Sequence, residues 1–175
     1  NYTAAIQAAG LRAPNLMTKI WDVNGAVGGP VKRDRLWFFA AARSQGNRKL
    51  VAGMFNNQNA GDVNAWTYVA TTAQATDDGT WKNINGRLTW QASPRNKFNF
   101  FWDEQRLCIS CIGGGNATTA PEARGNNHAG PRVEQATWTS PATGRLLLEA
   151  GWGGNLIDQY GTQGNLPNYR ELIPV

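Results

Sequence analysis

Hydrophobic and polar residues alternate along residues 81–107, with one interruption at a turn that contains a proline. Alternation with a period of two is typical of a β-strand whose two sides differ, because successive side chains point to opposite faces of a sheet. One face is predicted to carry Ile84, Leu88, Trp90, Phe98, Phe100 and Trp102. The other is predicted to carry Asn83, Asn85, Arg87, Thr89, Gln91, Lys97, Asn99, Asp103 and Gln105. The stretch therefore predicts two strands, 81–91 and 97–107, that form a hairpin with an apolar, aromatic face and a polar face.

The same alternation predicts three further strands, over residues 21–31, 132–140 and 145–156. A sixth strand, 36–45, is predicted from a strongly apolar run whose alternation fails at residues 37–39. Residues 3–10 are predicted to form a short helix. Thr3 can cap its start and Gly10 can end it.

Short and long connections alternate between these six strands. The short ones are predicted at 32–35, 92–96 and 141–144, and the long polar ones at 46–80 and 108–131, with a short strand near 49–55. This rhythm predicts an all-β, antiparallel up-and-down meander with all its long loops on one edge. The organisation expected is a loop with a short helix over 1–19, a sheet over 20–156, and the start of a further outer loop or strand over 157–175.

Two environments fit such a sheet. In an outer-membrane β-barrel the apolar face meets lipid and the polar face lines the interior. In a soluble all-β binding module, such as a carbohydrate-binding one, the apolar face would be enclosed. Aromatic residues near strand ends favour the barrel, because they match an interfacial girdle: Trp90, Trp102, Trp138 and Trp152. Loops of about 25–35 residues on one edge are also unusual for a compact soluble domain.

Composition changes this picture little. The chain has 175 residues, a formal net charge of +5 and eight tryptophans. Its densest basic cluster, Lys32, Arg33 and Arg35, flanks a predicted turn, so nucleic acid is not an expected partner. No apolar run approaches the ~20 residues of a membrane-spanning helix. The chain begins at Asn1 rather than Met and shows no leader, so we expect it to be an excerpt of a longer protein.

The pair Cys108 and Cys111 allows three interpretations: a redox pair, half of a metal site or a local disulfide. A redox pair requires a helix after the first cysteine, but glycines 113–115 follow instead. A zinc site requires further ligands, and the single histidine, His128, lies seventeen residues beyond Cys111. We therefore predict a local disulfide and no metal.

No catalytic set emerges. His128 lies alone in a loop rich in glycine and asparagine, and adjacent Asp103 and Glu104 point to opposite faces of a strand. The segment 113–116 lacks the lysine of a phosphate loop. We therefore expect neither enzymatic activity nor a cofactor.

The long loops are the expected site of ligand contact. Amide hydrogen bonds and ring stacking would suit a glycan or a siderophore, and the candidates are Asn56, Asn57, Asn59, Trp66 and Tyr68. The alternative is that these residues only fill a hydrated loop. On the polar face, Arg87, Lys97 and Asp103 are expected to pair across strands.

Three stretches resemble TonB-dependent outer-membrane receptors. They are WDVNGAVGGPVKRDRLWFFAAAR (21–43), GRLTWQASPRNKFNFFWDEQ (86–105) and QATWTSPATGRLLLEAGWG (135–153). The first resembles the beginning of the barrel and the others resemble barrel hairpins, most closely in the Oar-like receptors with a carboxypeptidase-regulatory-like domain. The resemblance covers about residues 20–155 and does not include the plug or the TonB box.

This resemblance implies a segment of an outer-membrane barrel of about 22 strands. The segment would belong to a receptor that imports a siderophore, cobalamin, a glycan or a peptide with energy from the TonB system. The partners it implies are outer-membrane lipid, the plug domain, which the polar-face residues could also meet, and the TonB complex. The localisation it implies is the bacterial outer membrane.

Overall fold

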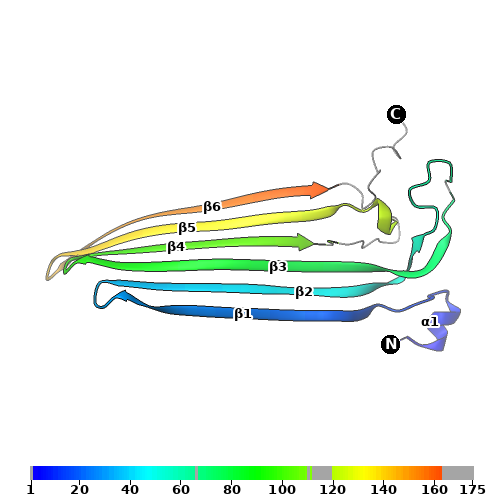
Figure 1. Ribbon diagram of the computed structural model, residues 1–175, viewed down its shortest axis with the longest axis horizontal. Coiled ribbons are helices and arrows are strands. Elements are labelled where there is room, and N and C mark those ends of the chain that lie inside the picture. The colour runs from blue at the N-terminus through cyan, green and yellow to red at the C-terminus, as the bar shows by residue number, and fades with distance from the viewer. Residues whose placement is uncertain (1, 66, 110, 112–119, 163–175) are drawn as a thin grey trace.

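The structure is a computed structural model that describes residues 2–65, 67–109, 111 and 120–162. These residues form one antiparallel sheet of six strands, and each strand pairs with its neighbours in the chain (Figure 1). The strands are β1 (Leu16–Lys32), β2 (Leu36–Asn57), β3 (Ala70–Ser93), β4 (Asn96–Ile109), β5 (Asn126–Thr143) and β6 (Leu146–Thr162). The predicted all-β meander of six strands is confirmed. The sheet is open, with β1 and β6 as its two edges.

The predicted N-terminal helix is also present. It is α1 (Ala4–Ala8), and the Thr3 hydroxyl accepts a hydrogen bond from the Ile6 N–H at 3.4 Å. Gly10 follows with a φ of +100°, a conformation that glycine adopts without steric cost. A single 3₁₀ turn, η1 (Pro121–Ala123), precedes β5. Among the described residues, no helix is long and apolar enough to cross a membrane.

The two kinds of connection lie at opposite ends of the sheet. The short turns that join β1 to β2, β3 to β4 and β5 to β6 lie together at the left of Figure 1, and α1 and the longer connections lie at the right. The first turn is closed by a hydrogen bond of 3.1 Å from the Arg35 N–H to the Lys32 carbonyl. In it Asp34 has a φ of +61°, which aspartate tolerates better than most residues.

The predicted bounds of the long connections are wrong. Strand β2 continues beyond residue 45 to residue 57, and β3 begins at residue 70 rather than 81, so their connection is 58–69 rather than 46–80. The connection between β4 and β5 likewise falls within 110–125 rather than 108–131. Polar residues extend the ladder because they pair across strands, with Arg48 opposite Asp78 and Lys49 opposite Asp77. Opposite charges at facing positions favour strand pairing without any apolar face.

The register of β3 and β4 gives the sheet the two faces expected from the alternation. Leu88 lies opposite Phe100, and Trp90 lies opposite Phe98, with ring centroids 5.5 Å apart. We call the apolar face near the short turns the apolar belt. Its members are Val27, Leu36, Phe38, Ala40, Ala42, Ile84, Leu88, Trp90, Phe98, Phe100, Trp102, Ala136, Trp138, Leu148, Ala150 and Trp152. The opposite face, called the polar face, is dominated by amides, hydroxyls and charges, with aromatic exceptions at Trp37, Phe39, Trp81 and Phe101.

The sheet has almost no core of its own. Among the described residues, the buried apolar side chains are Ala75, Cys108 and Pro121, while Ile84 is 51% exposed and Trp152 is 59% exposed. The accessible surface is 12121 Å² for a mass of 19.1 kDa. A folded monomer of that mass exposes about 8,400 Å². The apolar belt is therefore a surface without a covering layer in this chain.

Candidate ligand-binding groove on the polar face

Two hollows adjoin on the polar face, in the half of the sheet near the long connections. Their volumes are about 650 Å³ and 280 Å³, and Gln45 and Trp81 line both of them. We call the combined hollow the Trp81 groove. The polar-face side chains along it are Ile20, Asp22, Arg43, Gln45, Asn47, Lys49, Asp77, Trp81, Asn83, Gln105 and Leu107.

Strand register places the indole of Trp81 in the middle of this groove. Trp81 lies opposite Gln45 of β2 on one side and opposite Leu107 of β4 on the other. Its side chain is 42% exposed. The sequence analysis did not select Trp81, although a signal was present: its odd position puts it on the same face as Asn83 and Asn85, away from the apolar belt.

The charged side chains along the groove are paired with one another. Arg43 and Asp22 form an ion pair in which the guanidinium Nε donates to Oδ1 at 2.8 Å. Lys49 Nζ lies 3.0 Å from Asp77 Oδ2. Two positive and two negative groups thus offset one another within the groove.

Polar groups without an internal partner also line the groove. The side-chain amides of Gln45 and Asn47 and the indole N–H of Trp81 make no hydrogen bond with any residue that the structure describes. Each amide offers both donors and an acceptor, and the indole offers a donor. These three groups can therefore bind a polar ligand.

A hydrogen-bonded network around Asp103 forms the adjacent floor of the polar face. Asp103 is 9% exposed and accepts hydrogen bonds from Asn83 Nδ2 at 2.5 Å and from Gln105 Nε2 at 2.8 Å. Asn83 in turn accepts a bond from Asn85 at 2.9 Å. The bond from Asn83 crosses from β3 to β4, so the network holds two groove residues in fixed positions.

The other two polar-face residues expected to pair across strands do not do so here. Arg87 and Lys97 make no ion pair with any residue that the structure describes. Both lie closer to the short turns than the groove does.

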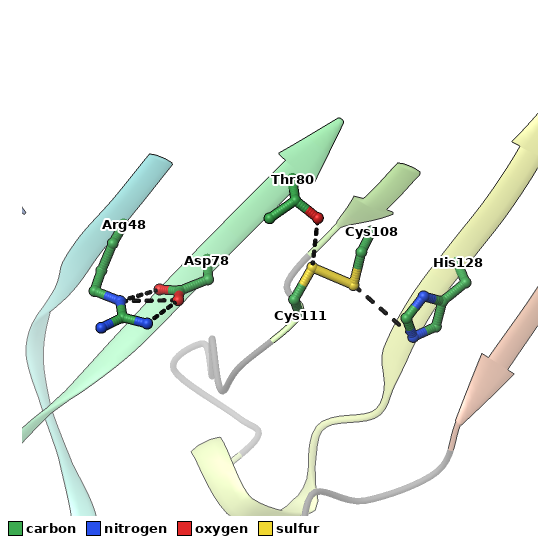
Figure 2. The surroundings of a disulfide bond; sticks show 6 residues. All are labelled: Arg48, Asp78, Thr80, Cys108, Cys111 and His128. Carbon is green, nitrogen blue, oxygen red and sulfur yellow. Dashed lines mark hydrogen bonds and ion pairs between the residues drawn. A yellow bond between two sulfur atoms is a disulfide. The ribbon is translucent and has the colours of Figure 1, made fainter. Parts of the chain in front are cut away.

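The two cysteines are joined by a disulfide at the end of β4 (Figure 2). His128 Nε2 lies 3.8 Å from Cys108 Sγ, and Thr80 Oγ1 lies 3.6 Å from Cys111 Sγ. His128 is distant in sequence, but the β4–β5 register puts it directly opposite Cys108. Its ring stacks on Tyr160 with centroids 5.0 Å apart. In the part of the chain that the structure describes, no group of three or more His, Cys, Asp and Glu side chains could hold a metal ion.

An ion pair joins β2 and β3 beside the disulfide (Figure 2). Arg48 Nε donates to Asp78 Oδ2 at 2.8 Å, and Nη2 donates to the same carboxylate at 2.6 Å. The hydrogen bond to Asp78 raises the pKa of Arg48 above its ordinary value. The backbone carbonyl of Asp78 also accepts a bond from the Cys111 N–H at 2.7 Å. This contact ties the disulfide loop to the sheet.

Two of the asparagines predicted to contact a ligand in and beside the β2–β3 connection form hydrogen bonds to the backbone of that connection. Asn57 Oδ1 accepts bonds from the N–H groups of Asn59 at 3.2 Å and Val69 at 2.9 Å. Asn59 Nδ2 donates to the Thr67 carbonyl at 2.7 Å. Asn56 is half-buried near the end of β2. The amides of Asn57 and Asn59 therefore have an internal role, and ligand contact by these residues stays a prediction.

Tyr68 has a similar internal role. Its hydroxyl donates to the Phe55 carbonyl at 3.0 Å, while the side chain remains 53% exposed. Trp66, the remaining candidate, lies outside the described residues.

The two long connections touch each other at this end of the sheet. The Asn57 N–H donates to Glu122 Oε1 of η1 at 2.6 Å. The structure thus brings the predicted loop residues to the same end of the molecule as the Trp81 groove.

Comparisons of the chain with protein-family models, with curated proteins and with solved structures find no match.

Proposed function

We propose that this chain forms part of the barrel wall of a TonB-dependent outer-membrane receptor that imports a scarce ligand. The observation that carries the proposal is a single sheet with one apolar face and one polar face, neither of which is covered by a layer of the residues that the structure describes. Leu88, Phe100 and Trp102 are 37%, 42% and 38% exposed. A contiguous apolar surface of this kind fits a lipid or protein interface rather than water.

The size of the exposed surface indicates how much area a covering layer would remove from water. The chain exposes about 3,700 Å² more than a folded monomer of its mass would. Covering apolar area stabilises a protein by about 25 cal/mol per Å². Acyl chains around a barrel would remove the apolar part of this excess from water, and a soluble module would need a second layer to do the same.

The open edges fit the same proposal. In hydrocarbon every backbone N–H and C=O must be paired within protein, so a sheet crosses a membrane only as a closed barrel. The edge strands β1 and β6 have one unpaired side each. Further strands beside them would close the wall.

The length and border of the apolar belt also suit a membrane. On β6 the apolar side chains of this face run from Leu148 through the belt to Leu156, a span of nine residues, and on β3 they run from Ile84 to Trp90, a span of seven. A tilted strand needs about 9–11 residues to cross. Charged residues begin at the border of the belt and are paired there: Arg132 lies 2.8 Å from Glu134, and Arg106 lies 2.5 Å from Glu104. Paired charges near hydrocarbon cost less than single ones.

Energy-coupled import enters the proposal through the resemblance of residues 21–43, 86–105 and 135–153 to receptor barrels. In this arrangement the polar face lines the interior and meets the plug domain. The TonB complex then acts through the plug.

A pair of neighbouring residues on opposite faces tests the membrane placement. Leu88 belongs to the apolar belt and Arg87 to the polar face, and each would be replaced by cysteine in separate variants of the complete protein. After membrane fractionation and spin labelling, Leu88→Cys should be accessible to oxygen and shielded from a charged nickel chelate. Arg87→Cys should show the reverse preference.

The paired cysteines Cys108 and Cys111 should not take the label without reductant. Chelate access to Leu88→Cys, or recovery of the complete protein in a soluble fraction, would refute the membrane proposal. A soluble protein in which Leu88→Cys is shielded from both reagents would instead favour an all-β binding module with an enclosed apolar layer.

A further inference from the structure

We propose that the Trp81 groove binds a neutral oligosaccharide, with one pyranose ring stacked on the indole of Trp81. The inference rests on the proposed function, in which the polar face lines the interior of a barrel and is reached by the ligand. It adds a ligand class and a binding subsite to that function.

The first argument is the position of an exposed indole on a polar face. Trp81 lies between Gln45 of β2 and Leu107 of β4, and the rest of the groove is lined mainly by amides and paired charges, so packing in an aromatic cluster does not account for the ring. A pyranose ring has an apolar C–H surface that can cover an indole and a rim of hydroxyls that donates and accepts hydrogen bonds. An amphipathic aromatic side chain with polar neighbours complements both parts.

The second argument is the set of unpartnered polar groups beside the ring. Gln45 lies directly opposite Trp81, and Asn47 follows two residues later on the same face of β2. Both amides lack an internal hydrogen bond within the described residues. Such groups gain most from a ligand that supplies several hydroxyls, because each amide can both donate and accept.

The third argument is charge. The ion pairs Arg43–Asp22 and Lys49–Asp77 leave no unbalanced charge along the groove. A polyanionic ferric complex would require unpaired cations, and a cationic peptide would require unpaired carboxylates. A neutral, hydroxyl-rich ligand requires neither. The larger hollow, at about 650 Å³, lies within the ~300–1,000 Å³ usual for small-molecule sites.

The test is a binding titration of the complete protein purified in detergent. The probes are soluble gluco-, xylo- and galacto-oligosaccharides of four to six sugars, together with a ferric tris-catecholate as the anionic comparison. At least one oligosaccharide should bind and change the tryptophan fluorescence, and the tris-catecholate should not compete with it. Trp81→Ala should weaken binding about 30-fold, the loss typical of a central aromatic contact. The matched control, Trp152→Ala on the apolar belt, should bind as the wild type does.

Two milder variants protect the test against a folding defect in Trp81→Ala. Trp81→Phe keeps a ring and should bind within about fivefold of the wild type, whereas Gln45→Ala removes one hydrogen-bonding amide and should weaken binding about fivefold. The inference is overturned if no oligosaccharide binds, if the tris-catecholate competes, or if Trp81→Ala and Gln45→Ala both bind like the wild type. Failure of binding in a protein that still passes the spin-label test would leave the membrane proposal standing. Sugar binding by a protein that fails the spin-label test would refute only that proposal.

Discussion

The strands of this sheet have two halves that differ in kind. In the half near the short turns, the faces contrast, with Leu88 and Phe100 on one side and Thr89 and Asn99 on the other. In the half near the long connections this contrast is lost, because Lys82 and Arg106 occupy the positions of the apolar face while Trp81 and Leu107 lie on the other face. Side chains alternate between the two faces along the whole length of each strand, but only the half near the short turns has a face that is apolar enough for hydrocarbon. A period of two therefore indicates a strand, and the difference between its faces indicates the environment.

The two halves are also held together differently. In the turn half, stacked rings such as Trp90 and Phe98 meet across β3 and β4 on the apolar face. In the loop half, ion pairs join neighbouring strands, and Arg48–Asp78 is the best-formed pair, while the disulfide closes a local loop at the end of β4. We expect the turn half to depend on lipid and the loop half to depend on polar contacts.

The largest expected effect comes from a charge placed in the turn half. Leu88→Lys puts an ammonium on the apolar belt and should reduce the free energy of unfolding in lipid vesicles by about 2–4 kcal/mol, because a charge near the bilayer midplane loses its hydration. Thr80→Lys, on the same face of β3 but in the loop half, should cost less than about 1 kcal/mol. Denaturant unfolding of both variants in vesicles measures the difference. Equal losses in the two variants would mean that the two halves share one environment.

The sequence allowed prediction of the six strands, their order and their two faces, because each of these follows from local alternation and connection length. It did not predict where β2 and β3 end. Asn47 and Lys49 have low strand propensity, and the pairing of residues 47–49 with 77–79 depends on register, which is a tertiary property.

The site was predicted less well than the fold for the same reason. Asn57 and Asn59 have the chemistry of ligand residues, but only the folded loop shows that their amides bond to its backbone. The contact of His128 with Cys108 likewise depends on β4–β5 register. Sequence reasoning could have found Trp81, because its odd position in the predicted strand 81–91 places it on the face opposite to the apolar belt.

A middle-sized effect is expected from the Asp103 network, which lies on the polar face where the two halves meet. Asp103→Ala leaves the donors of Asn83 and Gln105 without their acceptor and should reduce the free energy of unfolding by about 1–3 kcal/mol. Asp158→Ala, at an exposed position of β6, is the control and should stay within about 0.5 kcal/mol of the wild type. The same vesicle assay applies. A loss for Asp103→Ala as small as the control's would mean that water replaces the network. Internal hydrogen bonds on the polar face would then contribute little to the free energy of unfolding.

The smallest effect should come from the ion pairs of the loop half. Asp78→Ala removes a buried carboxylate that Arg48 binds with two nitrogens, but the Arg48 side chain that remains is 46% exposed and can be hydrated, so the loss should be about 1 kcal/mol or less. The neighbouring variant Asp77→Ala breaks the single contact to Lys49 and should cost less still. Hydrogen exchange resolves such local changes. In Asp78→Ala, the amides of β2 after residue 46 and of β3 before residue 80 should exchange faster, while those around Leu88 keep their protection. If protection fell equally in both halves, the sheet would unfold as one cooperative unit, and the difference between its halves would concern environment alone and not stability.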